Sequence, residues 1–78
     1  MTLSIISSHS VLFTGEADSV TLPGVKGSFT VLKNHAPLIS VLTAGKVVCK
    51  MAHGEEKDIE IKGGIVDVED NKIDVCVY

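Results

Sequence analysis

Apolar and polar residues alternate along most of this chain, and that period of two is typical of strands with one buried face. The clearest run is residues 57–62, which read Lys-Asp-Ile-Glu-Ile-Lys and place Ile59 and Ile61 on the same face. Similar alternation occurs in residues 46–52 and 72–78. No segment shows the period of an amphipathic helix, so the pattern predicts an all-β protein.

Glycine, proline and asparagine divide these runs into short segments. Gly15-Glu16, Pro23-Gly24 and Asp70-Asn71 each predict a turn, and Gly63-Gly64 permits positive φ or a bulge. We therefore expect an antiparallel β-sandwich of about nine to ten short strands in two sheets, forming a single domain over residues 1–78. Strands are expected near residues 3–6, 11–13, 17–22, 28–32, 38–42, 46–52, 57–62, 65–69 and 72–78.

The least generic stretch is residues 27–40, in which two predicted strands flank a polar corner. Asn34 tolerates the left-handed backbone that such a corner needs. Pro37 fixes its own φ and pushes Ala36 into an extended conformation. The corner should therefore be stiff and should present His35 in a defined direction.

Composition and charge exclude several functional classes. The 78 residues suffice for one domain, and their formal net charge is −3, with seven lysines and no arginine. Nucleic-acid binding depends on clustered basic residues, so that class is rejected. The chain has no apolar run of 18 residues, and residues 1–10 lack the pattern of a secretory leader, so a cytosolic location is expected.

The cysteines and histidines do not form a recognisable site. Cys49 and Cys76 lie in predicted strands and are expected to be small buried apolar residues. His9, His35 and His53 fall in three separate loops without the local pairing of a zinc site. For His35, two roles remain open: a hydrogen bond that holds the corner, or an exposed contact with a partner.

No serine lies in a nucleophile elbow, and no glycine-rich segment precedes a helix that could bind phosphate. The residues alone thus indicate a non-catalytic module without a cofactor. A carrier domain of the lipoyl or biotinyl type is the alternative, although Lys33 lacks the neighbouring Met or Asp that such domains use. A small β-sandwich enzyme is a third interpretation.

Three segments in order resemble one known family. Residues 27–40 contain a glycine, a short strand and the sequence His-Ala-Pro-Leu, followed by an apolar strand. Residues 13–20 resemble the early "F-x-G-x-x-x-x-V/I" run of that family, and residues 63–68 resemble its "GG-hydrophobic-x-E/D-V" strand. On these motifs the chain resembles the N-terminal β-sandwich domain of the epsilon subunit of F-type ATP synthase.

The resemblance implies a non-catalytic subunit of the central stalk in a proton-translocating ATP synthase. Such a subunit binds gamma, contacts the c-ring and turns with both beneath the F1 alpha and beta subunits, at the cytoplasmic face of the bacterial inner membrane. His35, Ala36, Pro37 and Leu38 correspond to the loop near gamma. Ser28 corresponds to a position that faces the c-ring, where many relatives have Glu.

The resemblance also implies a difference at the C-terminus. Most bacterial relatives continue into two helices that restrain ATP hydrolysis and, in some species, bind ATP. The sequence ends at Tyr78 without a C-terminal helical hairpin. We therefore expect the 78-residue chain to lack both helix-based inhibition and ATP binding.

Overall fold

A computed structural model describes all 78 residues and contains eight β-strands and no helix. It therefore has no helix that could cross a membrane. The strands are β1 (Thr2–Ile6), β2 (Val11–Gly24), β3 (Gly27–Leu32), β4 (Leu38–Leu42), β5 (Gly45–Met51), β6 (Glu56–Ile61), β7 (Gly64–Glu69) and β8 (Lys72–Val77). The prediction of an all-β fold is confirmed.

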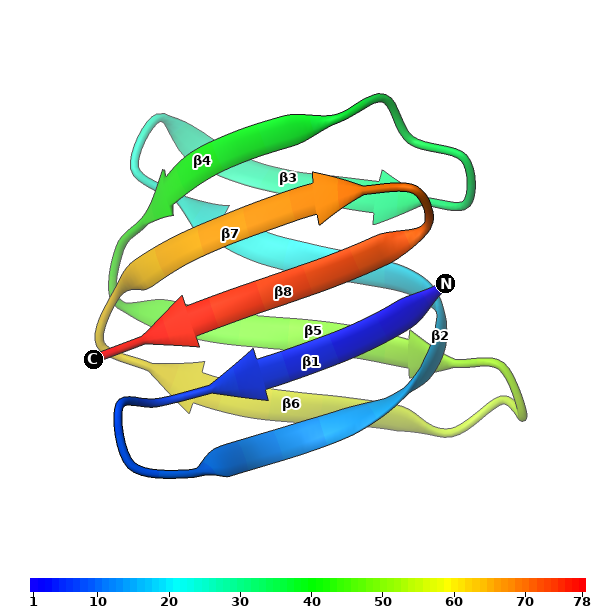
Figure 1. Cartoon of the computed structure of the whole chain (residues 1–78), viewed down its shortest axis with the longest axis horizontal. Coiled ribbons are helices and arrows are strands. Elements are labelled where there is room, and N and C mark those ends of the chain that lie inside the picture. The colour runs from blue at the N-terminus through cyan, green and yellow to red at the C-terminus, as the bar shows by residue number, and fades with distance from the viewer.

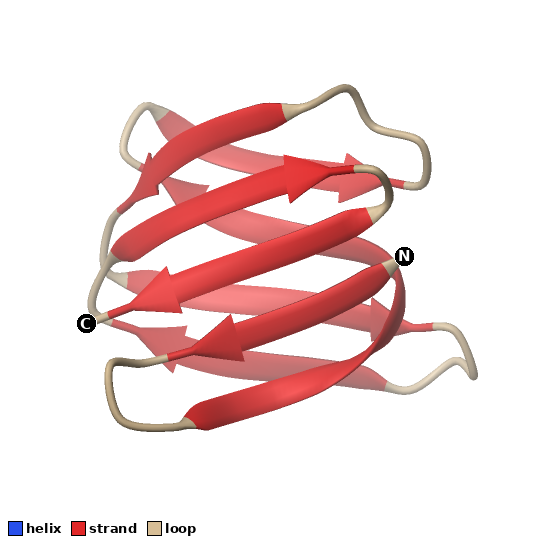
Figure 2. Ribbon diagram, in the orientation of Figure 1, coloured by secondary structure: helices blue, strands red, loops and turns tan.

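The strands form two layers that share β2 (Figures 1 and 2). The front layer contains β4, β7, β8, β1 and the first half of β2, whereas the back layer contains β3, the second half of β2, β5 and β6. All pairings are antiparallel except that between β1 and β8. Because one strand belongs to both layers, the layers are joined through continuous backbone.

Sixteen buried apolar residues form the core between the layers. They come from alternate positions of the strands, as a half-buried sheet requires. No polar or charged residue is buried. The core residues are Leu3, Ile5, Ala17, Val20, Leu22, Val31, Leu42, Val47, Cys49, Met51, Ile61, Val66, Val68, Ile73, Val75 and Val77.

The turn predicted at Gly15-Glu16 is wrong, and this error accounts for one of the surplus predicted strands. β2 continues through this point, since Gly15 pairs with Leu3 and Glu16 with Thr2 of β1. Gly15 is instead a position of close packing: a Cβ there would lie 2.9 Å from Met51 Cε and 3.2 Å from Phe13 Cζ. The strand bends slightly later, where its pairing with β5 shifts between Ala17 and Ser19. Such a bulge lets one strand leave the front layer and enter the back layer.

The turn predicted at Asp70-Asn71 is confirmed. Both residues have positive φ, 50° and 60°, and the flanking Glu69 and Lys72 pair directly. A two-residue loop with two left-handed residues is the type I′ turn that matches the twist of a hairpin, and Asp and Asn are among the few residues that tolerate it. Gly63 also has positive φ, 143°.

The prediction for the cysteines holds for one of them. Cys49 is fully buried, and burial, with a smaller contribution from the charge of Asp58, raises the pKa of its thiol from 9.0 to about 11. Cys76 is exposed, so its predicted burial is wrong. Its neighbours Val75 and Val77 point into the core, which places Cys76 on the outer face of β8.

Candidate partner-docking site

The corner loop, residues 33–37, connects β3 in the back layer to β4 in the front layer. Asn34 has φ of 62°, which confirms the left-handed backbone predicted for it. The His35 N–H then donates a hydrogen bond to the Leu32 carbonyl oxygen at 3.2 Å. At the start of the loop, Lys33 lies 3.5 Å from an Asp18 carboxylate oxygen.

Asn34 also anchors the loop to the β7–β8 turn. Its N–H donates to Asn71 Oδ1 at 2.7 Å, and Asn71 Nδ2 donates to Asn34 Oδ1 at 3.0 Å. Sequence reasoning missed this pair, because the two residues are 37 positions apart. Each asparagine by itself indicates only a local turn.

The His35 side chain is exposed, and Nδ1 lies 2.7 Å from the carbonyl oxygen of Ala36. This contact is local, so the long-range anchor of the corner is Asn34. Ala36 and Pro37 are exposed, whereas Leu38 is half-buried and packs against the core. Of the four residues expected to face gamma, three thus have accessible side chains, and Leu38 mainly supports the loop.

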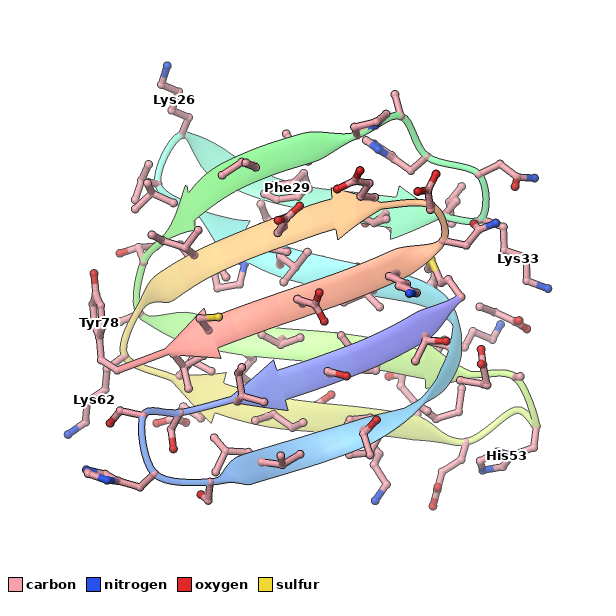
Figure 3. The ribbon with its side chains drawn as sticks, viewed as in Figure 1. Lys26, Phe29, Lys33, His53, Lys62 and Tyr78 are labelled. Carbon is pink, nitrogen blue, oxygen red and sulfur yellow. The ribbon has the colours of Figure 1, made fainter.

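Ser28 lies far from the corner loop, at the other end of β3. It pairs with Pro23 beside the tight turn at Val25 and Lys26, and its side chain is exposed. Figure 3 shows the separation through labelled neighbours: Lys26 lies at one end of the sandwich and Lys33 at the opposite end. The structure therefore does not bring the two predicted contact regions together.

An apolar row, which sequence reasoning did not identify, crosses the outer face of the front layer. Its members are directly opposed on neighbouring strands: Val41 pairs with Ile65, Ile65 with Cys76, Cys76 with Ile6 and Ile6 with Val11. Val41 and Ile65 are each 48% exposed, and Val11 is 65% exposed. The row continues into a hollow of about 380 Å³, whose lining also includes Ser7, Ser8, Val77 and Tyr78.

The same face becomes acidic toward the β7–β8 turn. The acidic patch consists of Asp67, Glu69, Asp70 and Asp74, with Lys72 among them. Asp67 and Asp74 are directly opposed on adjacent strands, an arrangement that is unfavourable unless solvent or a cationic partner screens the charges. The patch lies on the strands that carry the apolar row and leads to the turn that holds the corner loop.

The outer face of β5 and β6 in the back layer is different, because charged residues of opposite sign face one another there. Lys46 is opposed to Glu60 and Lys50 to Glu56, with Val48 between the two lysines. Such pairs are typical of a solvated sheet surface. The contrast marks the front face as the one suited to a protein partner.

The chain contains no group of three or more His, Cys, Asp or Glu residues placed to bind a metal ion. Its sequence matches the family model of the ATP synthase delta/epsilon chain β-sandwich domain over residues 1–78. The chain belongs to this family. The resemblance found in the three sequence segments is therefore confirmed.

Individual relatives agree with the family assignment. The chain is 40% identical to the ATP synthase epsilon chain of Leptospira borgpetersenii over 96% of its own length and 58% of that protein. It is 42% identical to the epsilon chain of Chlorobaculum tepidum, with coverage of 91% and 81%. It thus spans little more than half of the Leptospira relative.

Solved structures confirm the sandwich fold. A chain in the Euglena gracilis mitochondrial ATP synthase structure, which comprises OSCP, F1 and the c-ring, aligns with a TM-score of 0.88 at 21% identity. That alignment covers 96% of this chain and 48% of the other. A chain of the Tetrahymena thermophila mitochondrial ATP synthase central stalk and c-ring aligns with a TM-score of 0.84 at 19% identity, with coverage of 100% and 63%.

Proposed function

We propose that residues 1–78 form a non-catalytic rotor domain in the central stalk of an F-type ATP synthase. The domain binds gamma through its front face and contacts the c-ring through the end that carries Ser28. It thereby helps to transmit c-ring rotation to the catalytic alpha and beta subunits of F1. The observation that carries the proposal is the exposed apolar row on a domain of this family.

The apolar row supplies the driving force for docking to gamma. Covering half-exposed β-branched side chains removes apolar surface from water without ordering long flexible side chains. The acidic patch and the corner loop, with His35, Ala36 and Pro37, border the same face, and the carboxylates and the His35 imidazole provide polar contacts. This division into an apolar centre and a polar rim is the usual anatomy of a protein interface.

The c-ring contact is proposed at the β2–β3 turn. Ser28 and Lys26 line one hollow of about 510 Å³ together with Ile39 and Val41 of β4. The Ser28 hydroxyl donates and accepts hydrogen bonds but carries no charge, so Lys26 provides the charge among the residues that line this hollow. A contact of this kind is polar, modest in strength and suited to the loops of a membrane ring.

The fold supports a mechanical role. A domain that transmits torque has to resist shear between its layers, and β2 joins both layers while 16 buried residues pack between them. Close-packed protein interiors deform little under load.

As part of F1, the domain would be peripheral to the membrane. Because the Leptospira and Chlorobaculum relatives are bacterial epsilon chains, we place it at the cytoplasmic face of the bacterial inner membrane. The alternative of a lipoyl or biotinyl carrier loses its basis. The whole chain matches the ATP synthase delta/epsilon β-sandwich family, and Lys33, the residue that such a carrier would modify, lies in an exposed ion pair with Asp18.

Site-directed photocrosslinking in native membranes tests the proposal. A photoreactive amino acid placed at Ile65 or His35 is expected to crosslink to gamma, and one placed at Ser28 is expected to crosslink to the c subunit. The same label at Val48, on the charged back face, is the matched control and is expected to give neither product. Equal gamma crosslinking from Val48 and Ile65 would contradict the assignment of the front face.

A further inference from the structure

Asn71 lies outside every segment that the family motifs single out, yet it contacts the corner loop. We infer that Asn71 is a positioning residue for partner docking, because its side chain fixes the corner loop at the edge of the front face. This inference rests on the proposed function and identifies a determinant of the same interface. We call the reciprocal hydrogen-bonded pair of Asn34 and Asn71 the asparagine clasp.

Asn71 joins three segments that are distant in the sequence. Its side-chain oxygen accepts the N–H of Asn34 at 2.7 Å, and its side-chain nitrogen donates to Asn34 Oδ1 at 3.0 Å. Its backbone carbonyl accepts the N–H of Thr2 at 2.9 Å. The β7–β8 turn therefore holds both the corner loop and the start of β1.

The corner loop has few other restraints. The His35 N–H bond to Leu32 is local, and the Lys33–Asp18 ion pair is exposed on both sides. No other hydrogen bond links residues 33–37 to the front layer. The asparagine clasp is thus the one side-chain link that ties the Asn34–His35 part of the loop to the front layer, whereas Pro37 is held by its neighbour Leu38, which pairs with Val68.

The clasp places two separate demands on position 71. The backbone requires positive φ, which Gly, Asn and Asp tolerate, and the side chain requires one donor and one acceptor. Glycine meets only the first demand. Aspartate meets the first and keeps the acceptor for the Asn34 N–H, but it replaces the donor with an oxygen that faces Asn34 Oδ1. Asn71→Gly and Asn71→Asp therefore disrupt the hydrogen bonds of the clasp while keeping a residue that tolerates the positive φ of the turn.

The test uses this chain and the gamma subunit of its own organism. Affinity for gamma is measured by calorimetry for the unaltered chain, Asn71→Gly, Asn71→Asp, Asn34→Gly and the double glycine variant. Amide hydrogen exchange at Asn34 and His35 is measured in the same proteins. Asp70→Gly is the control for added turn flexibility in the exchange measurement, since Asp70 also has positive φ and makes no side-chain hydrogen bond.

Asn71→Gly is expected to weaken gamma binding about five- to tenfold and to speed exchange at Asn34, while the thermal midpoint falls by only a few degrees because both lost hydrogen bonds are exposed. Asn71→Asp should also weaken binding. The double variant should bind no more weakly than Asn71→Gly, because both changes break one clasp. Asp70→Gly should leave exchange at Asn34 unchanged.

Three results would overturn the inference in different ways. Normal gamma binding by Asn71→Gly would show that the clasp does not position the interface, while leaving the proposed function intact. Failure of the unaltered chain to bind gamma would overturn the proposed function and the positioning role together. Unchanged exchange at Asn34 in Asn71→Gly would show that the clasp does not restrain the loop.

Discussion

Replacing Ile65 with threonine should weaken docking to gamma more than it weakens the fold. Ile65 is 48% exposed, and it lies between Val41 and Cys76 in the apolar row. Fully burying an isoleucine side chain contributes about 1.5–3 kcal/mol, so covering the remaining half contributes roughly 1 kcal/mol. Threonine retains β-branching and strand propensity but loses most of this gain. The dissociation constant should therefore rise about fivefold.

Adding Val41→Thr provides a stronger version of the same test. Val41 is equally exposed and directly opposed to Ile65. The double variant should lose about 2 kcal/mol of binding free energy, which is roughly a thirtyfold weaker complex. Val48→Thr makes the same type of change on the charged back face and should leave affinity unchanged.

Calorimetric titration of gamma gives the affinities, and urea unfolding gives the free energy of unfolding for the same proteins. Ile73→Val serves as the stability standard, because Ile73 is fully buried and the substitution should cost about 0.5–1.5 kcal/mol of folding free energy. The reasoning would be refuted if Val48→Thr weakened binding as much as Ile65→Thr. It would also be refuted if the double threonine variant bound gamma normally.

Other predictions concern the fold and the corner. The free energy of unfolding should fall as pH rises from about 9 toward 11, because the Cys49 thiol loses its proton at lower pH in the unfolded chain than in the folded chain. Urea unfolding across this pH range measures the fall, and Cys49→Val should abolish it. Gly64→Ala should cost about 3 kcal/mol in urea unfolding, since a Cβ there would overlap the Cys76 carbonyl oxygen; stability equal to the parent would refute this. Pro37→Gly should cost about 0.5–1 kcal/mol in thermal unfolding and should weaken gamma binding. In the folded chain a thiol reagent should modify Cys76 rapidly and Cys49 only slowly, as mass spectrometry after short exposure would show.

The sequence predicted those features that depend on neighbours along the chain. Alternation placed Ile59 and Ile61 toward the core, and the Asp70-Asn71 pair predicted a tight turn. These inferences succeed because strand period and turn backbone are local properties. The left-handed Asn34 was predicted for the same reason.

Features created by pairing between distant strands were not predicted. Gly15 indicated a turn, although its role depends on Met51, which packs against it from β5. Cys76 was expected in the core, although the valines on either side of it point inward. The apolar row and the asparagine clasp exist only once β1, β4, β7 and β8 are in register, so no local pattern could reveal them.

Affinity purification of the tagged chain from its own organism tests the central claim most directly. Membranes would be solubilised gently, and the proteins that co-purify would be identified by mass spectrometry. The account predicts recovery of gamma, the alpha and beta subunits of F1 and the c-ring. Recovery of an acyltransferase or carboxylase in place of these subunits would contradict the rotor function and would make Lys33 the residue to test.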